Sequence, residues 1–486
     1  MRILLVKPAP DAIRFGLAPF FVTEPLGLEY VAAALQAEGR ETRIVDLRFE
    51  RASIERIASG WQPDIVGISC VHILDVHAGL ALADAAKRAN PASVVVAGGH
   101  AISAYPAAMS GSRSIDAIVL GEGERALPAV ARALQGGEGL ASVPGLLVPS
   151  GDGEFTPTGP VPSPLDLASV PLPARSMVGR YQRRYCCLNY MPVWTIETAR
   201  GCEHRCKFCS VWEFHRKAVR FHPIASVRAD FAAAGENVFV VDDTFWTGRE
   251  RSAELADALR SLPPRNWMLV QSRADTVVEQ ASVLEKWRPL ARRFDIFFGF
   301  EAPTAAGLRS LHKDADISAT LEAVAVAKRL GFGVTGNFII DPDATEEDFE
   351  ALWSFLETHA IDRVGFTILT PLPGTRFFNA MDDCVAVRDW DQYDLHHLVS
   401  QPRLPVEKFF ELYCETWRRS VLNLRGRKKW WQWLREARPA QAFRLARILR
   451  QTQMLMDPAH YIAEARVQID NTQLKLQPPR GSGRVR

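Results

Sequence analysis

The sequence contains no apolar run long enough to span a bilayer, which takes about 20 residues. Its first apolar run, residues 3–6, is ended by Lys7 and Pro8, so it is typical of a buried strand and not of a signal peptide. Cysteine is scarce, with eight in 486 residues, which excludes a disulfide framework. We therefore expect a cytoplasmic protein, with at most a peripheral attachment to membranes.

An excess of charge of one sign is also missing overall, because the net charge is only +2. Hydrophobic residues make up 47% and charged residues 23%, as in folded globular proteins. Residues 418–450 are the exception, with eleven Lys or Arg and a single acid, Glu436. Four tryptophans lie in or beside this segment: Trp417, Trp430, Trp431 and Trp433.

Two interpretations of the basic, Trp-rich segment stay open. It is a solvated helix face whose tryptophans pack on the neighbouring domain, or an interfacial helix that contacts anionic lipid through residues 415–456. No nucleic-acid recognition fold accompanies the charge, so we expect no nucleic-acid partner. Residues 386–486 are predicted to form a helical C-terminal domain.

The first 140 residues alternate short apolar runs with helical segments. Near-continuous apolar strands indicate a parallel sheet covered on both faces. We therefore predict a Rossmann-like, doubly wound α/β domain over residues 1–140. Its five strands are expected at residues 3–6, 42–47, 64–69, 93–97 and 116–120.

Small and glycine-rich residues follow the third, fourth and fifth of these strands. In open parallel sheets, ligands bind beyond the carboxyl ends of the strands, and glycine lets a bulky ligand approach the backbone. The alternative is that these are only tight strand-to-helix turns. The candidate ligand-binding residues are Ser69, Cys70, Val71, Gly98, Gly99, His100, Gly121, Glu122 and Gly123.

Residues 141–190 are rich in Gly, Pro and Ser and are expected to form a linker. Residues 191–385 then alternate six strands with helices, which predicts a partial (β/α)6 barrel. Polar residues follow each strand, and in such barrels polar residues at the carboxyl ends of strands are functional. In the turn after the fifth strand, Asp343 or Thr345 is expected to cap the next helix.

A three-cysteine loop follows the first strand of this barrel. Cys202, Cys206 and Cys209 stand in a C-x3-C-x-Φ-C pattern, with Phe208 before the last cysteine. Electron-transfer 4Fe–4S clusters use four cysteines, so three thiolates leave one iron open to a small molecule. A zinc site would need a fourth ligand at finger-like spacing, and His204 is badly placed to supply it.

This spacing resembles the radical S-adenosylmethionine (SAM) superfamily. The resemblance implies that SAM chelates the open iron of a 4Fe–4S cluster held by the three cysteines. Glu301 could accept hydrogen bonds from the SAM ribose or ammonium, and Arg273 could pair with its carboxylate. The alternative for each of these residues is a purely structural role, as a cap at the end of a strand or as a charge exposed to solvent. The implied SAM contacts are Phe208, Asp242, Asp243, Arg273, Glu301, Pro373 and Gly374.

The first domain resembles the cobalamin-binding domain that precedes many radical SAM domains, with Ser69 and the pair Gly98–Gly99 at matching places. Cobalamin domains with a cobalt-ligating histidine carry D-x-H-x-x-G after the first strand, and this chain does not. We therefore expect that neither His72 nor His77 ligates cobalt. Four remaining cysteines are expected to be free thiols and not a second cluster: Cys186, Cys187, Cys384 and Cys414.

The segment with Trp390, Tyr393, Asp394 and His397 resembles the branch that contains the anaerobic magnesium-protoporphyrin cyclase and hopanoid methylases. The resemblance implies a cobalamin-dependent methyltransferase acting on an unactivated carbon. SAM cleavage would yield a 5′-deoxyadenosyl radical that abstracts a substrate hydrogen, and methylcobalamin would supply the methyl group. The reductant would be an external donor such as flavodoxin or ferredoxin.

The substrate is the least determined part of this prediction. The chain most resembles hopanoid C-3 methylases, which implies a lipid substrate. The alternatives are a tetrapyrrole-modifying cyclase or methylase, and a cobalamin- and SAM-binding regulator without turnover. An intact three-cysteine loop argues against the regulator.

Overall fold

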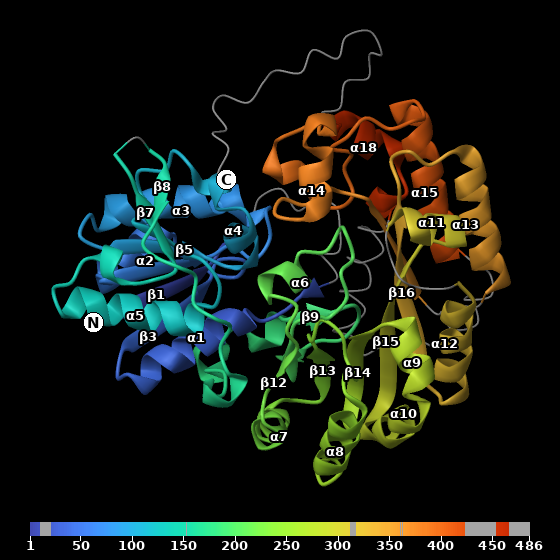
Figure 1. Ribbon diagram of the computed structural model, residues 1–486, viewed down its shortest axis with the longest axis horizontal. Helices are drawn as coiled ribbons and strands as arrows, with labels where there is room; N and C mark the ends of the chain where they lie inside the picture. Colours follow the sequence, from blue (N-terminus) through green and yellow to red (C-terminus); the bar gives the residue numbers. More distant parts are fainter. Residues whose placement is uncertain are drawn as a thin grey trace.

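The computed structural model describes residues 1–9, 21–151, 153–311, 317–359, 361, 363–422 and 453–465, except the side chains of 382, 421 and 422. Two sheets lie next to each other, and the C-terminal helices pack beside the second (Figure 1). Most of the basic, Trp-rich segment lies outside the described residues. Among the described helices, none is both long and apolar enough to cross a membrane.

The first sheet has seven strands in the order β3-β1-β4-β5-β6-β7-β8. It is parallel from β3 to β6, while β7 and β8 are antiparallel additions from the segment expected to be a linker. The strands are β1 (Arg2–Lys7), β3 (Glu41–Asp46), β4 (Ile65–Ser69), β5 (Val94–Gly98), β6 (Ala117–Val119), β7 (Leu146–Pro149) and β8 (Phe155–Pro157).

Helices cover both faces of this sheet, because its central strands are apolar on both sides (Figure 1). The pair α1–α5 packs on one face and the pair α2–α3 on the other. These helices, with the short α4, are α1 (Leu26–Ala37), α2 (Ile54–Trp61), α3 (Asp75–Ala89), α4 (His100–Ala104) and α5 (Gly123–Gln135).

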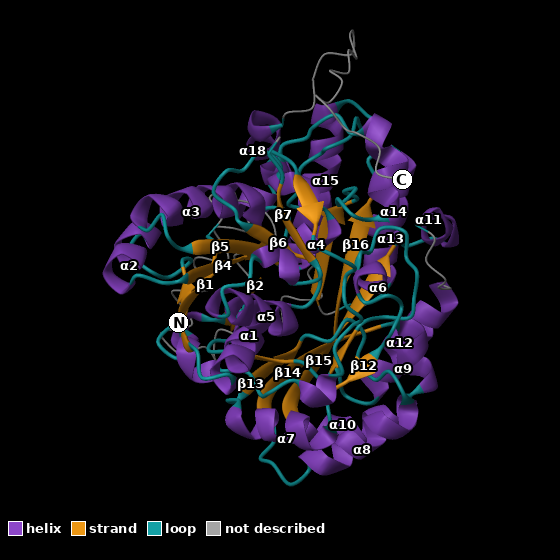
Figure 2. Cartoon of the chain, turned by 60° about the vertical axis from the view of Figure 1, so that its left-hand side comes forward, coloured by secondary structure: helices purple, strands orange, loops and turns teal. Residues whose placement is uncertain are grey.

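The second sheet has six parallel strands, each followed by one or more helices, and its order is the chain order. In the described part of the chain, the first strand β10 and the last strand β17 do not pair with each other, so the barrel is open (Figure 2). The predicted fold class is confirmed. The strands are β10 (Trp194–Ile196), β13 (Asn237–Val240), β14 (Arg265–Ser272), β15 (Ala291–Glu301), β16 (Gly333–Ile340) and β17 (Arg363–Ile368).

The outer layer of the barrel is formed by α7 (Ile224–Ala233), α8 (Arg249–Leu259), α9 (Ala274–Glu279), α10 (Ala281–Trp287), α12 (Ile317–Arg329) and α13 (Glu346–Thr358). Thr345 caps α13, as predicted, in a capping box with Asp348. Shorter elements are β2 (Phe21–Val22), β9 (Cys186–Cys187), β11 (Ala199–Arg200), β12 (Arg220–Phe221), α6 (Val211–Phe214), α11 (Ala305–Ser310) and α14 (Arg376–Met381). The last described helices are α15 (Val406–Leu422) and α18 (Pro458–Glu464).

The free edge of β10 is capped by side chains from outside the barrel. The Thr195 N–H donates to Glu24 Oε1 at 2.6 Å, and the Thr195 carbonyl accepts from the Arg175 guanidinium at 2.7 Å. Arg175 also forks onto Asp230 of α7 at 2.7 and 2.8 Å and contacts Glu24 at 2.6 Å. One arginine therefore joins the first domain, the connecting segment and the barrel.

Glu29 of α1 lies in the same cluster and is fully buried, with its nearest oxygen 3.8 Å from Arg175. Burial, and then the nearby Glu24 carboxylate, raise the pKa of Glu29 well above its ordinary value, although Arg175 opposes this. Asp230 and Glu24 already engage the single cation, and neither oxygen of the buried Glu29 carboxyl has a hydrogen-bond partner among the described residues.

Glu29→Gln is expected to stabilise the protein at pH 8 but not at pH 4.5. The folded-state pKa of Glu29 lies above the ordinary 4.5, so the folded state holds a proton that the unfolded chain has lost. Stability from this group therefore falls as pH rises above about 4.5, by about 1.4 kcal/mol per pH unit until the folded-state pKa is reached. Urea unfolding at both pH values measures the difference, and a gain from the exposed Glu279→Gln control equal to that of Glu29→Gln would contradict it.

The free edge of β17 is capped in a similar way by the C-terminal segment. The Ile368 N–H donates to the Leu395 carbonyl at 2.6 Å, and the Phe366 carbonyl accepts from the Tyr413 hydroxyl of α15 at 3.1 Å. Two outward-facing backbone groups of this strand are therefore satisfied.

The predicted Tyr-Asp-His motif holds this second cap in place. Asp394 accepts hydrogen bonds from the backbone N–H groups of His396 and His397 at 2.8 and 2.9 Å and pairs with His397 Nδ1 at 3.0 Å. His396 Nδ1 lies 2.8 Å from the Tyr413 hydroxyl. Burial lowers the pKa of His396 to about 4, so its ring is neutral. The motif has a structural role here.

Candidate active site

The three cysteines lie on one irregular loop between β11 and α6, and all three are partly exposed free thiols. Among the described residues, only His77, Asp389 and Asp391 bring three potential metal-ligand atoms within 4.8 Å of one another. The three cysteine sulfurs are therefore not all within 4.8 Å of one another, so they do not form a closed set of donors around a single zinc ion, whose bonds to sulfur are about 2.3 Å long.

Contacts from three directions fix the backbone of the cysteine loop. The N–H of Gly201 donates to Asp243 Oδ2 at 2.8 Å, and the Trp212 indole N–H donates to the Cys206 carbonyl at 3.1 Å. The N–H of Phe377 donates to the Lys207 carbonyl at 3.1 Å. The loop is therefore held at both ends and in its middle.

The thiol of Cys209 does not favour ionisation in the absence of iron. Burial raises the pKa of Cys209 to about 12, and a hydrogen bond from the Val211 backbone opposes this. Iron ligation requires the thiolate, so cluster binding must displace this proton. The soft sulfur donors and their spacing fit an iron–sulfur cluster.

The acidic pair after β13 lies next to the loop but divides into two environments. Asp242 is buried, and its two oxygens accept from the backbone N–H, at 2.6 Å, and the hydroxyl of Thr198. Burial raises the pKa of Asp242 to about 7 and that of Asp243 to about 6. Asp242 therefore braces the strand before the loop, whereas Asp243 is exposed and available to a ligand.

Arg273 follows β14 and lies near the cysteines. Burial alone would lower the pKa of Arg273, but Asp275 and the charges of Cys206 and Cys202 raise it above its ordinary value. Its guanidinium forks onto Asp275, with contacts of 3.1 and 2.6 Å. The sequence did not foresee this local pair. A SAM carboxylate would have to bind Arg273 alongside Asp275.

Glu301 ends β15 in an unusual backbone conformation, with φ +62°. The N–H of Ala302 donates to the Phe300 carbonyl at 2.8 Å, which makes Glu301 the centre of a three-residue turn. The register between β15 and β16 also shifts between Gly299 and Glu301. Such strain in a non-glycine residue clusters at functional sites, so it supports the predicted ligand role.

Phe208 and the turn at Pro373 and Gly374 bound the same end of the barrel. Phe208 packs against the buried cluster formed by Leu311, Leu369 and Phe377. Gly374 has φ +84°, and a Cβ there would lie 2.5 Å from the Ala104 side chain of α4. Only glycine lets this turn approach the first domain so closely.

The ends of β4 and β5 form a second cluster of predicted residues. Cys70 is buried, while Val71 is 43% exposed despite its apolar side chain. His72 is exposed as well, yet burial among surrounding protein lowers its pKa. The exposed Val71 is one apolar group at this strand end that a bound ligand could cover.

Gly99 and His100 lie between this strand end and the cysteine loop. Gly99 has φ +116°, and a Cβ would lie 2.4 Å from the Cys70 carbonyl oxygen, so no other residue fits. His100 Nε2 lies 2.7 Å from the Ser210 hydroxyl, directly after the last cluster cysteine. Burial lowers the pKa of His100 to about 4, so the ring is neutral.

Gly121 and Glu122, at the end of β6, line a cavity of about 300 Å³. Its walls come from α5, from residues 143–145 and 161–165, and from Phe214 and His215 beside the cysteine loop. A cavity at the carboxyl edge of a doubly wound sheet is where this fold binds nucleotide-like groups. The space and the glycine-rich lining fit part of a cobalamin.

The sequence did not foresee an ionic network centred on Arg200, two residues before Cys202. Arg200 contacts Glu122 at 2.9 Å, Glu124 at 2.7 Å and Glu197 at 2.7 Å. Arg220 adds a second contact to Glu122 at 3.0 Å. Burial works against ionisation of Glu122, but Arg220, the Leu165 N–H and Arg200 together lower its pKa. The Glu122 carboxylate therefore joins the two domains.

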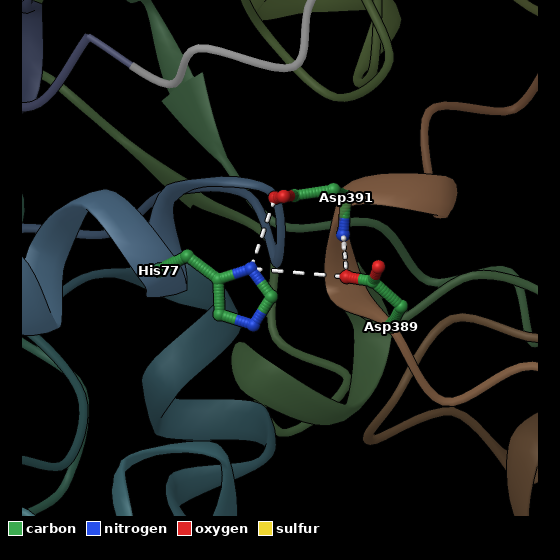
Figure 3. A group of neighbouring side chains, drawn as sticks. All are labelled: His77, Asp389 and Asp391. Carbon is green, nitrogen blue, oxygen red and sulfur yellow. Dashed lines mark hydrogen bonds and ion pairs between the residues drawn. The ribbon is translucent and has the colours of Figure 1, made fainter. Parts of the chain in front are cut away.

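His77 contacts the C-terminal segment, as Figure 3 shows. Its Nδ1 lies 3.1 Å from Asp391 and 3.8 Å from Asp389. Together with the absence of a ligating motif, this contact supports the expectation that His77 is not a cobalt ligand, which stays a prediction. Cys186 and Cys187 are buried in β9, Cys414 is buried in α15, and Cys384 is exposed.

Two family models match the chain: the B12 binding domain over residues 17–131 and the Radical SAM superfamily over residues 196–356. The hopanoid C-3 methylase of Methylococcus capsulatus is 30% identical over 415 residues, which cover 84% of this chain and 78% of that protein. The chain belongs to the cobalamin-dependent radical SAM methyltransferase family. Its cofactors are a 4Fe–4S cluster, SAM and cobalamin.

Other members of this family are related over most of the chain. The anaerobic magnesium-protoporphyrin IX monomethyl ester cyclase of Rubrivivax gelatinosus is 25% identical, covering 83% of this chain and 74% of that protein. Two solved structures share the fold. TsrM from Kitasatospora setae, with cobalamin and a [4Fe-4S] cluster, has a TM-score of 0.64 at 20% identity, covering 80% and 79% of the two chains. OxsB, with aqua-cobalamin and SAM, has a TM-score of 0.69 at 15% identity, and the match covers 94% of this chain and 71% of OxsB.

Proposed function

We propose that this radical SAM enzyme transfers a methyl group to an unactivated carbon of a hopanoid lipid. The observation that carries the proposal is the 30% identity to a hopanoid C-3 methylase along 84% of the chain. The alternative, a tetrapyrrole cyclase or methylase, rests on relatives at 25% identity over a similar span. The lower identity makes it the second choice.

The inward face of the barrel supports a bulky apolar substrate. In β15 the side chains at Phe298 and Phe300 are buried toward the helices, whereas the alternate position Phe297 stays partly exposed. Phe239 of β13 is partly exposed in the same way and packs with Phe297. The stacked rings of Tyr190 and Trp267, 4.1 Å apart, lie in this apolar group. This inward-facing group, which we call the aromatic lumen, favours a hydrocarbon skeleton over a charged one.

The protein's own groups would bind, orient and shield the reactants. We assign Cys202, Cys206 and Cys209 to the cluster, and Glu301, Asp243 and Arg273 to the polar groups of SAM. When bound, these cofactors supply the substrate-carbon radical and the methyl group. The aromatic lumen would exclude water from this reaction. We also assign the β4, β5 and β6 ends to cobalamin and contact with anionic lipid to residues 415–456.

A substrate competition assay tests the proposal. Reconstituted enzyme with SAM, cobalamin and dithionite receives equal amounts of an unmethylated hopanoid and magnesium-protoporphyrin monomethyl ester. We expect a product 14 Da heavier from the hopanoid alone, detected by mass spectrometry. A modified tetrapyrrole without methylated hopanoid would establish the alternative. Release of neither 5′-deoxyadenosine nor S-adenosylhomocysteine would exclude turnover altogether.

A further inference from the structure

Trp212 of α6 connects the molecular surface to the cysteine loop. Its indole is buried, and its N–H donates to the Cys206 carbonyl at 3.1 Å. Two cations cover the ring: the Arg376 guanidinium carbon lies 4.7 Å from its centroid, and Lys217 Nζ lies 5.8 Å away. The two cations contact the indole ring, and the indole N–H makes one hydrogen bond to the backbone of a cluster ligand. Trp212 therefore lies between these cations and Cys206.

The surface around Trp212 is rich in positive charge. Next to Arg376, Lys207 of the cysteine loop lies with its Nζ 5.0 Å from the Phe377 ring. The same loop carries the exposed Arg205 and one exposed acid, Glu203. Among the described residues, no carboxylate ion pair is formed by Arg205, Lys207 or Lys217, and Glu213 pairs only with Arg376 at 3.1 Å. We call these four cations the basic rim. Charges left unpaired on one face favour an anionic partner.

The backbone at Lys217 shows that its position is specified. Arg216 and Lys217 both have left-handed conformations, with φ +51° and +62°. The Lys217 N–H donates to the Trp212 carbonyl at 2.7 Å and closes the end of α6. Glycine is the usual residue at such a helix end, because it adopts positive φ without strain. Lys217 therefore occupies a position where glycine would adopt the same backbone conformation with less strain.

We propose that the basic rim is the docking surface for an acidic one-electron donor protein of the flavodoxin type. The inference rests on the proposed function, because reductive SAM cleavage needs one electron for each cleaved SAM. In the docked complex the reduced flavin would lose one electron and become the semiquinone, and the cluster would go from the 2+ to the 1+ state. Trp212 and the Cys206 backbone would provide the route between them.

The experiment measures donor binding and donor-driven turnover separately. Binding of a fluorescently labelled flavodoxin to the reconstituted enzyme is followed by anisotropy at 50 mM and 500 mM NaCl. The variant Lys217→Glu/Arg376→Glu is expected to bind at least about tenfold more weakly at low salt, with the difference shrinking at high salt. The variant Lys217→Arg is expected to bind like the wild type.

Arg329→Glu is the matched control, because this exposed arginine ends α12 beside the N-terminal end of β16, away from the loop. The charge-reversal variant is expected to need about tenfold more flavodoxin for half-maximal 5′-deoxyadenosine formation, but to keep wild-type turnover with dithionite. Unchanged flavodoxin affinity, or a loss as large in Arg329→Glu, would overturn the proposal. If dithionite yields no turnover even in the wild type, the proposed function fails, while the binding result still decides on the docking surface.

Circular dichroism and iron content are measured on every variant before binding. If the double variant loses iron or helix content, the two single substitutions and the neutral Lys217→Ala variant replace it. Each is expected to weaken binding by a smaller, salt-sensitive factor. Wild-type affinity in all three folded variants would count equally against the basic rim.

Discussion

Arg175→Met is expected to lower the free energy of unfolding by about 3–5 kcal/mol, because it leaves buried carboxylates without their cation. Arg175 contacts Glu24 at 2.6 Å and Asp230 at 2.7 Å, and both acids are nearly inaccessible to solvent. The same substitution removes the hydrogen bond to the Thr195 carbonyl at the edge of β10. Urea unfolding of anaerobically purified protein, followed by tryptophan fluorescence, measures the loss.

Two further variants show whether the unpaired charge is the cause. Arg175→Met/Asp230→Asn removes one of the stranded acids and is expected to recover part of the lost stability. Arg175→Lys keeps the charge but not the fork and is expected to fall between wild type and Arg175→Met. Equal losses in all three variants would point to lost packing volume in place of charge.

Cys206→Ala is expected to reduce bound iron from about four atoms per chain to below one. Two thiolates cannot hold a cubane that already depends on only three protein ligands. SAM cleavage should fall below detection for the same reason. Iron analysis and the visible absorption spectrum after anaerobic reconstitution measure this directly.

Cys384→Ala is the matched control for the cluster, because this exposed cysteine lies outside the loop. It should keep its iron and its absorption spectrum. Loss of iron in Cys384→Ala, or retention of about four iron atoms in Cys206→Ala, would contradict the assignment of the cluster to the loop.

Local patterns in the sequence were sufficient for the architecture. The apolar runs of β1, β4 and β5 are buried on both faces, so composition alone marks them as central strands. The spacing of the three cysteines and the cap at Thr345 are local as well. The strands β7 and β8 were missed because they are short and half-exposed, which leaves only a weak periodic signal.

Contacts between distant residues were beyond the sequence. Glu122 and Arg200 are 78 positions apart, and no local pattern indicates that they pair. Asp242 was predicted from its place after a strand, but its engagement with Thr198 depends on strand register. The turn strain at Glu301 likewise arises from a register shift between two strands.

The two capped strands have a consequence for aggregation through the open edges of the sheet. An incomplete barrel has two open sheet edges, and exposed backbone groups at an edge recruit strands from other molecules. Here Glu24 and Arg175 occupy one edge, while Leu395 and Tyr413 occupy the other. Glu24 of the first domain and Arg175 of the connecting segment thus cover part of β10, and the C-terminal segment covers part of β17. Both contacts hinder edge-to-edge aggregation. A fragment limited to the six-stranded barrel would expose both edges and self-associate.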